Sequence, residues 1–400
     1  MAIKVVADEI ASAIGSSSWI RRMFEAGAEL RKKIGDENVF DFSLGNPDLP
    51  PPDEAAAALH ALADDLLKPR ALGYPSNAGF MPFREALAAK LAAEQEVPSL
   101  AAKHVVVSCG AAGAITSFFR AVLNPGDEVL VPSPYFVEYG SYCRHFGGKL
   151  IPVPAKRDTF DIDLAAMEAA ITPNTRVIMF NSPNNPTGCV YSEESVQALG
   201  DMVNRINENR ERPIFILSDE PYRFLAYDNA KVPSVLSKSP FAIVLGSFSK
   251  SLSMAGERVG YLVANPDLPN IDQFLAAVVL TTRTLGFVNA PIIGQKLAMR
   301  VLNCGVDLSI YAERREKMLA ILDEVGLKYV RPNGAFYVFP EVPGGDDVRF
   351  VGHLLEHGVL AVPGSGFGCP GFMRLSYSVE TDVIERSKEA FARAVASYKV

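Results

Sequence analysis

A lysine and an arginine eight residues apart are the first candidates for chemistry in this sequence. Lys250 and Arg258 lie in GSFSKSLSMAGERVG, residues 246–260, a segment of small residues that follows an apolar run ending at Leu245. A lysine at the end of a strand can be desolvated, which lowers the pKa of its amine and makes it a nucleophile toward carbonyl carbons. The same composition is also typical of a solvated surface loop, so this segment alone leaves both interpretations open.

Carboxylate and amide side chains follow two other apolar runs. Asp219 comes directly after one of them, and Tyr222 lies three residues later. A carboxylate at a buried strand end is costly unless a cation or proton donor pairs with it, although aspartate is also a common helix N-cap. Asn181 and Asn185 lie in FNSPNNPTGCVYS, residues 180–192, where prolines and glycine prevent regular structure. Amides there could bind a hydroxyl or carboxylate of a ligand, or simply form a turn.

Small residues and an aromatic residue complete the set. Gly110, Ala111 and Ala112 begin a helical pattern directly after another apolar run. Small residues at a helix start let backbone N–H groups approach a phosphate, and the helix dipole favours the anion. The segment is not the GxGxxG dinucleotide fingerprint. Phe136 follows a further strand pattern, where it could stack on a planar ring or belong to the core.

Short apolar runs that alternate with amphipathic stretches must position these residues. The pattern predicts strands over 105–108, 128–132, 150–153, 176–181, 213–218, 242–245 and 259–263, and helices over 111–123, 137–146, 163–171 and 193–209. Ser192 is the expected N-cap of the last of these helices. This alternation is typical of an α/β fold with a mostly parallel sheet and helices on both faces. Ligands of such sheets bind at the carboxyl ends of the strands, so we expect all the candidate residues there.

After Asn289 the pattern becomes mostly helical, with helices over 290–302, 308–325 and 383–398 and strands over 335–339 and 373–376. We therefore expect a smaller α+β domain, which the N-terminal helix over 18–34 could join. The expected division is an N-terminal arm and helix over 1–48 that packs with the small domain, a large ligand-binding domain over 49–289, and a small C-terminal domain over 290–400.

Composition excludes several classes of protein. The 400 residues carry 39 Lys and Arg against 46 Asp and Glu, a net charge of −7, which disfavours a general nucleic-acid binder but not a site for one small anion. No apolar run approaches the ~18 residues of a membrane span, and Lys4, Asp8 and Glu9 disfavour a signal peptide. Five scattered cysteines without a CxxC pair predict free thiols. We expect a cytoplasmic protein without nucleic-acid or membrane partners.

Together, the motifs resemble one family over nearly the whole chain. NPD at 46–48, NNPTG at 184–188, DEPY at 219–222, SFSK at 247–250, GERVG at 256–260 and RLS at 374–376 are similar, in order and spacing, to class I/II pyridoxal-phosphate aminotransferases, the fold type I aspartate aminotransferase family. The resemblance implies pyridoxal 5'-phosphate as cofactor, no metal, and a homodimer with shared active sites. It also implies ping-pong transfer of an amino group from an L-α-amino acid to a 2-oxo acid.

The resemblance also implies roles for residues of this chain. Lys250 would form the internal aldimine and move the proton between the substrate's Cα and the cofactor's C4′ carbon. Asp219 would keep the pyridinium nitrogen protonated, so that the ring is an electron sink. Tyr222 and Asn185 would bind the phenolic oxygen. The other cofactor-binding residues would be Ser247 and Arg258 at the phosphate, the backbone N–H groups of Gly110, Ala111 and Ala112, the stacking Phe136, and Tyr74, which would reach the phosphate of the other subunit.

Substrate binding is implied in the same way. Arg374 would bind the substrate's α-carboxylate through two parallel hydrogen bonds, with Gly45 adding a backbone N–H and Asn185 lining the site. Arg283, in LTTRTLGFVNAP, could bind a distal carboxylate from the partner subunit, which would make aspartate or glutamate the substrates. If Arg283 is only a surface residue, then alanine, aromatic or other neutral amino acids fit equally well.

Other functions stay open at this level. A pyridoxal-phosphate β-lyase or synthase would use the same Lys250 and Asp219. His353 and His357 fit the H-x-x-E-H pattern of a zinc hydrolase, although an apolar stripe runs beside them and no third ligand is marked. A non-catalytic regulator would need a DNA-binding appendage, for which the residues before the first helix are too few.

Overall fold

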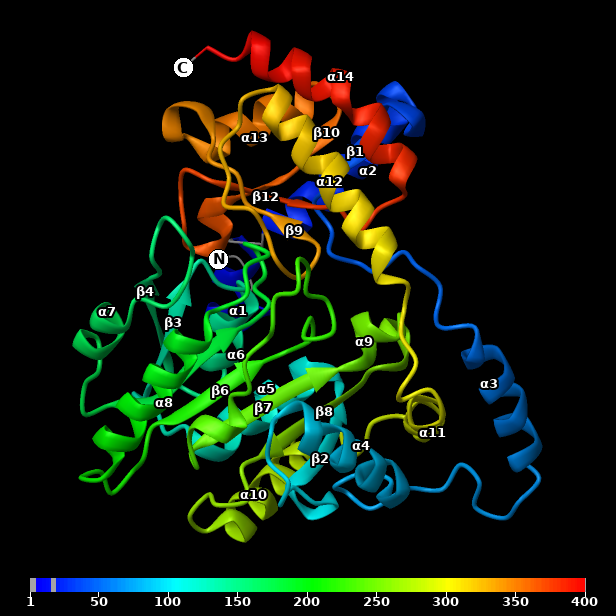
Figure 1. Ribbon diagram of the computed structural model, residues 1–400, viewed down its shortest axis with the longest axis vertical. Coiled ribbons are helices and arrows are strands. Elements are labelled where there is room, and N and C mark those ends of the chain that lie inside the picture. The colour runs from blue at the N-terminus through cyan, green and yellow to red at the C-terminus, as the bar shows by residue number, and fades with distance from the viewer. Residues whose placement is uncertain (1–4, 16–18, 400) are drawn as a thin grey trace. The chain divides into compact units, whose positions relative to one another are not determined.

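A computed structural model gives the fold of residues 5–15 and 19–399 (Figure 1). The chain divides into two units. Unit 1 contains the described residues up to Gly45, together with Glu313–Tyr329 and the chain from Phe336 onward, whereas unit 2 contains Asn46–Ala312 and Val330–Ala335. The described residues nearest each end of the chain therefore belong to unit 1.

Unit 2 is built on a seven-stranded sheet in the order β2-β8-β7-β6-β5-β3-β4. The neighbouring strands are parallel, except that β8 runs antiparallel to both β2 and β7. The expected mostly parallel sheet is confirmed. The strands are β2 (Val105–Cys109), β3 (Glu128–Ser133), β4 (Lys149–Pro154), β5 (Thr175–Asn181), β6 (Phe215–Asp219), β7 (Ala242–Ser247) and β8 (Val259–Ala264).

Two separate apolar cores cover the faces of this sheet, because successive residues of a strand point to opposite faces. Ile216 and Val244 belong to one core, which includes residues of α4, α8 and α11, whereas Leu217 and Leu245 belong to the other, with residues of α5, α6 and α10. The helices of this unit are α3 (Glu54–Asp65), α4 (Met81–Glu94), α5 (Gly110–Val122), α6 (Glu138–Arg144), α7 (Leu164–Ala169), α8 (Glu193–Asn207), α9 (Phe248–Ser251), α10 (Ile271–Thr284) and α11 (Ile292–Arg300), with 3₁₀ turns η2 (Ala102–His104), η3 (Leu236–Lys238) and η4 (Ala255–Glu257).

Helix α8 begins where the sequence predicts. The Ser192 side chain accepts a hydrogen bond from the backbone N–H of Ser195 over 3.1 Å. Such a cap satisfies one of the unpaired donors of the first helical turn and contributes about 1 kcal/mol to stability.

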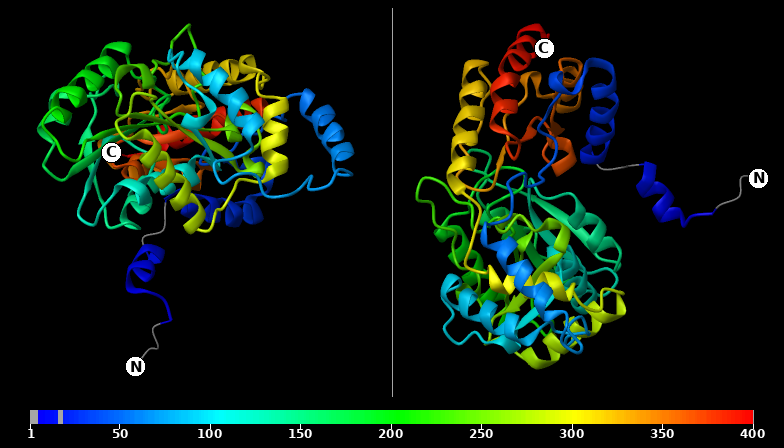
Figure 2. Two further views of the ribbon diagram at one scale, coloured as in Figure 1. Left: turned by 90° about the horizontal axis from the view of Figure 1, so that it is seen from below. Right: turned by 90° about the vertical axis from the view of Figure 1, so that its right-hand side faces the viewer.

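Unit 1 contains two small sheets. β1 and β10 are parallel, and β11, β12 and β9 form an antiparallel sheet in that order. α12 and α14 run side by side, joined by ion pairs from Lys317 to Glu385 (2.6 Å) and from Lys388 to Glu324 (2.8 Å) (Figure 2). The elements are α1 (Asp8–Gly15), α2 (Trp19–Ile34), η1 (Asp36–Asn38), β1 (Phe40–Asp41), α12 (Leu308–Glu324, which begins within unit 2), β9 (Tyr337–Val338), η5 (Pro343–Gly345), α13 (Asp347–Glu356), β10 (Val359–Leu360), β11 (Val362–Pro363), η6 (Gly364–Phe367), β12 (Met373–Ser376) and α14 (Thr381–Ser397).

Within residues 5–15 and 19–399, none of the helices combines the length and the apolar character that a membrane span requires.

Candidate active site

Asp219 is the last residue of β6, and its carboxyl group is buried. Tyr139 donates a hydrogen bond from Oη to Oδ2 over 2.6 Å, whereas Oδ1 has no hydrogen-bond partner among the described residues. Burial raises the pKa of Asp219 to about 7; the Tyr139 hydrogen bond lowers this pKa, and the negative charge of Glu220 raises it. A buried carboxyl group with one open oxygen can bind a cationic N–H group, such as that of a protonated ring nitrogen.

Tyr139 is a site residue that the sequence analysis does not single out. It lies in the first turn of α6, fully buried, and its ring meets the Phe136 ring edge to face with 5.5 Å between centroids. Burial and the charge of Asp219 raise the pKa of Tyr139, so the phenol keeps its proton and acts as the donor. Its only signal in the sequence is helical spacing, since it lies one turn after Phe136 and four residues before the buried Cys143.

The asparagine turn after β5 is bound to the end of β6. Asn181 and Asp219 are register partners in these parallel strands. Asn181 Nδ2 donates to the Asp219 carbonyl over 2.7 Å, and Asn181 Oδ1 accepts from the Asn185 N–H over 2.7 Å. Both ends of the Asn181 amide therefore bind backbone, which favours the turn over ligand binding, the two alternatives that the sequence leaves open for this residue. The buried Asn185 stays a predicted ligand-binding residue.

Lys250 lies at the end of the next strand. β6 and β7 are parallel neighbours, with Asp219 opposite Leu245. Ser247 ends β7 and α9 follows at once, so the half-buried Lys250 lies at the same edge of the sheet as Asp219. Tyr222, which is buried, follows Asp219 by three residues. The structure thus gathers an amine, a hydroxyl group, a carboxyl group and a phenol at the carboxyl ends of two adjacent strands.

A close junction of three segments completes this edge. Gly260 in β8 is the register partner of both Ser108 and Ser247. A Cβ atom on Gly260 would lie 2.7 Å from Gly110 Cα, and one on Gly110, whose φ is 67°, would lie 2.6 Å from Arg258 Nη2. The Arg258 guanidinium therefore lies against the first residue of α5, a helix whose N-terminus has no side-chain cap. A cation beside open helix N–H groups is suited to bind a phosphate.

Arg258 lies at this edge of the sheet, but its place relative to the nearest strand differs from the expectation. The sequence pattern indicates an arginine at the carboxyl end of a strand, but Arg258 precedes β8 and lies at its amino end. Because β8 is antiparallel to its neighbours, its amino end lies beside their carboxyl ends. Arg258 adopts a left-handed conformation (φ 52°), and its Nη1 donates to the Ala255 carbonyl over 3.1 Å.

Two expected residues lie on the surface of unit 2. Tyr74 is 90% exposed, and Arg283 is exposed near the end of α10. Neither side chain forms a hydrogen bond or ion pair with another residue of the described chain. By contrast, Phe136, Ala111 and Ala112 are half-buried beside Tyr139 or in the first turn of α5.

Arg374 is held in unit 1 by its neighbours in the fold. It is 1% exposed in β12, its Nη2 donates to the Ser43 carbonyl, and its Cζ lies 4.8 Å from the Tyr337 ring centroid and 4.9 Å from that of Phe367. A Cβ atom on Gly45 would lie 2.8 Å from Cζ of Tyr337, so this position needs a glycine. The two rings restrict the guanidinium plane, as binding a carboxylate with two parallel hydrogen bonds requires.

His353 in α13 and His357, which directly follows this helix, both contact helix α14. His353 Nε2 lies 3.1 Å from both the Ala394 carbonyl and Ser397 Oγ, and His357 Nε2 lies 3.3 Å from the same hydroxyl. Both rings thus bind the last turn of α14. No third histidine, cysteine or carboxylate joins them as a ligand group in the described part of the chain.

Comparison with known proteins identifies the family of this chain. Residues 37–391 match the family model for aminotransferase class I and II. The chain belongs to this family. A probable aspartate/prephenate aminotransferase of Aquifex aeolicus (strain VF5) is 36% identical over 374 residues, 88% of this chain and 90% of that protein. The aspartate/prephenate aminotransferase of Thermus thermophilus is 32% identical over 379 residues, 92% of this chain and 93% of that protein.

Solved structures extend the comparison to the fold. An amino transferase from Eubacterium rectale matches with a TM-score of 0.94 and 37% identity over 99% of this chain and 100% of that one. An aspartate aminotransferase from Thermus thermophilus with maleate matches with a TM-score of 0.85 and 29% identity over 98% of this chain and 100% of that one. The expected fold type I architecture is confirmed, and transamination is favoured over the lyase, hydrolase and regulator alternatives.

Aminotransferases of this family depend on pyridoxal 5'-phosphate, and so does this chain. Its residues fit the cofactor at two separated points. The open Oδ1 of Asp219 suits a protonated ring nitrogen, and the junction of Arg258 with Gly110, where a side chain at residue 110 would collide, suits a phosphate.

Proposed function

We propose that the carboxyl edge of the unit 2 sheet binds the cofactor and that Lys250 is the amine that reacts there. The observation that carries this proposal is the buried Asp219 carboxyl group, which has an open oxygen within the described structure. Asp219 ends β6, and Lys250 follows the end of the adjacent strand β7. Burying such a group without a partner costs free energy. A ring nitrogen that arrives with a proton offsets this cost.

Each residue then has a defined task. Pyridoxal phosphate supplies an electron sink for the negative charge that forms at the substrate's α carbon. Asp219 holds the proton on the ring nitrogen, and Tyr139 orients Asp219. Lys250 Nζ moves the proton at the α carbon.

The remaining residues bind and orient. Arg258, Ser247 and the N–H groups of Gly110, Ala111 and Ala112 bind the phosphate, which the α5 N-terminus and a guanidinium both favour. Tyr222 and Asn185 donate hydrogen bonds to the phenolic oxygen, and Phe136 packs on the ring. Arg374 and the Gly45 N–H bind the substrate's α-carboxylate, and Asn185 is a further substrate-binding residue.

We further propose that the substrates include dicarboxylic amino acids and that the protein is a cytoplasmic homodimer. The names of the Aquifex and Thermus relatives support aspartate, and the exposed Arg283 offers a cation for a second carboxylate. Tyr74, Leu67 and Leu72 are 90%, 92% and 57% exposed, which supports an interface on this side of unit 2. Five free cysteines support a reducing compartment.

The test of the cofactor site uses Lys250→Ala. With pyridoxal phosphate added, the purified protein should gain a near-ultraviolet to visible absorption band and transfer amino groups to 2-oxoglutarate. Lys250→Ala should lose turnover, whereas the control Lys90→Ala, at a half-buried lysine paired with Glu94, should keep it. A wild-type protein that takes up no pyridoxal phosphate contradicts the proposal.

The substrate proposal is tested separately. Arg283→Leu should lower kcat/KM for aspartate at least tenfold, because one charged hydrogen-bonded pair is lost, and should leave kcat/KM for alanine within about twofold. An unchanged value for aspartate removes Arg283 from the substrate site.

A further inference from the structure

Two adjacent carboxyl groups at the end of β6 face opposite sides of the sheet. Phe215 and Leu217 belong to one apolar core and Ile216 to the other. By this alternation, Asp219 continues the first face and Glu220 the second. Glu220 is also buried, at 4% exposure.

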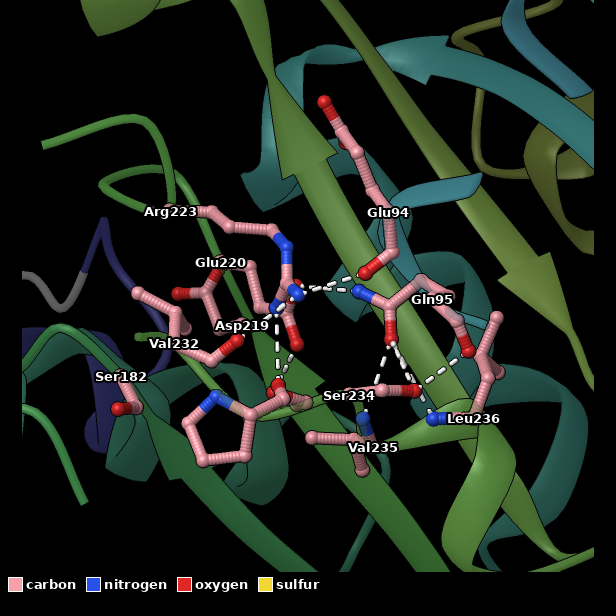
Figure 3. A network of polar contacts seen from close by, with 12 residues as sticks. Glu94, Gln95, Ser182, Asp219, Glu220, Arg223, Val232, Ser234, Val235 and Leu236 are labelled. Atoms are coloured by element: carbon pink, nitrogen blue, oxygen red, sulfur yellow. Dashed lines mark hydrogen bonds and ion pairs between the residues drawn. The ribbon is translucent and has the colours of Figure 1, made fainter. Parts of the chain in front are cut away.

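Glu220 is held by three side-chain donors. Ser218 Oγ donates to Oε1 over 2.8 Å. Gln95 Nε2 donates to Oε2 over 2.8 Å and Arg223 Nη1 donates to Oε2 over 3.1 Å (Figure 3). A buried carboxylate needs such partners. The backbone N–H of Glu220 donates to the Leu245 carbonyl over 2.8 Å, which extends the pairing of β6 with β7 by one residue beyond Asp219.

The partners of Glu220 are themselves fixed by backbone groups (Figure 3). Arg223 donates to the carbonyls of Glu94 (2.8 Å), Val232 and Pro233 (3.0 Å each). Gln95, which is fully buried, accepts from the Val235 N–H over 3.1 Å through Oε1. The end of α4 and the 232–235 segment are thereby tied to the residue that follows Asp219.

Fold stability alone does not call for a carboxylate here. An apolar residue would continue the face that carries Ile216, and a buried ion pair stabilises a fold no better than apolar residues of similar volume. What a carboxylate adds is negative charge, one residue from Asp219, on the side of the strand turned away from Tyr139.

We propose that Glu220 is a positioning residue for Asp219: with Gln95 and Arg223 it fixes the end of β6, and its charge strengthens the hold of this site on a protonated ring nitrogen. The inference rests on the proposed cofactor site. Burial is the main cause of the raised pKa of Asp219, and Glu220 adds to it. The negative charge behind the strand therefore favours a proton shared between Asp219 and the ring.

The experiment compares a variant without the charge with one that keeps it. Holoenzymes are reconstituted with pyridoxal phosphate carrying ¹⁵N in the ring, and the ¹⁵N chemical shift is followed against pH. In Glu220→Gln, which has nearly the same shape, the pKa of the ring nitrogen should fall by about one unit, and the Kd for pyridoxal phosphate should rise about three- to tenfold. Glu220→Met is a second variant without the charge if Glu220→Gln does not fold.

Gln95→Leu is the matched structural control. It breaks the hydrogen-bond network around Glu220 but leaves the charged side chains of Glu220 and Arg223 in place. It should lower Tm and leave the ¹⁵N titration within about 0.3 unit of the wild type. An unshifted titration in the charge-free variants, or an equal shift in Gln95→Leu, overturns the inference. A wild-type protein that binds no pyridoxal phosphate defeats the proposed function instead, so the two failures are distinct.

Discussion

Asp219 illustrates how a single side chain can be unfavourable for folding and useful for function. Its carboxyl group is buried with one hydrogen-bond donor and one open oxygen in the described structure. The resulting pKa of about 7, against an ordinary value of 3.8, means that ionisation opposes folding until a cation pairs with the open oxygen.

The stability of the cofactor-free protein should therefore depend on Asp219. Between about pH 4 and pH 7 the unfolded chain loses this proton and the folded chain keeps it, so stability falls as pH rises, by up to roughly 4 kcal/mol. Asp219→Asn removes this penalty. Urea unfolding without cofactor should show the variant gaining on the wild type from pH 5 to pH 8.5, and parallel curves would contradict the assignment.

Tyr139→Phe tests the donor that holds Asp219. Without the Oη hydrogen bond the pKa of Asp219 should rise further and the Kd for pyridoxal phosphate should increase at least tenfold, because a bond to a charged group contributes about 1.5–3 kcal/mol. Tyr142→Phe is the matched control, one helical turn later on α6 and without a hydrogen bond to Asp219. Cofactor titrations of both variants measure the difference, and equal losses would refute a specific role for Tyr139.

At the scale of elements, strand β8 determines how Arg258 meets helix α5. Its antiparallel course brings Arg258 beside the start of α5, and the absence of a side chain at Gly260 lets the strand approach Gly110. The direction of this strand and one glycine together form the junction that we propose as the phosphate site.

Gly260→Ala should disrupt this junction. The added methyl group would lie 2.7 Å from Gly110 Cα and 2.8 Å from the Ala111 nitrogen, and such overpacking costs about 1–3 kcal/mol. We expect a lower Tm. We also expect inorganic phosphate to compete less strongly with pyridoxal phosphate for binding to this variant. Gly256→Ala is the control, since a Cβ atom there meets nothing within 4 Å, and a Gly260→Ala variant that behaves like this control would argue against the junction.

At the scale of the whole molecule, the proposed homodimer would combine residues of two subunits in one site. Tyr74 is almost fully exposed and makes no side-chain hydrogen bond with the described residues of its own chain, which is the condition expected of a residue that serves a partner's site.

Mixed dimers test this role of Tyr74. Tyr74→Ala should weaken pyridoxal phosphate binding about tenfold, as the loss of about 1.4 kcal/mol would. In a hybrid dimer, one subunit carries Tyr74→Ala and the other carries Lys250→Ala. Such a dimer should contain one doubly defective site and one intact site. It should therefore regain high-affinity cofactor binding and roughly half the wild-type activity. Hybrids that stay as weak as the Tyr74→Ala homodimer would show that the tyrosine acts within its own subunit.

Local pattern was sufficient for much of this fold. The β12 bounds, Met373–Ser376, and the Ser192 cap agree with the sequence-based expectation, because strand periodicity and capping are properties of neighbouring residues. The positions of Asp219 and Lys250 at the carboxyl ends of strands could be inferred for the same reason.

Contacts between residues distant in sequence could not be inferred in this way. Tyr139 meets Asp219 across 80 residues and Gln95 meets Glu220 across 125, and no local pattern specifies which strand end a helix will face. The direction of β8, which places Arg258 at the site, is equally absent from the strand's own residues. Apolar alternation marks a strand as buried, but its neighbours in the sheet determine whether it runs parallel or antiparallel. The sequence therefore determined which chemical groups are present. Only tertiary packing decided their partners, their burial and the raised pKa of Asp219 that follows from burial.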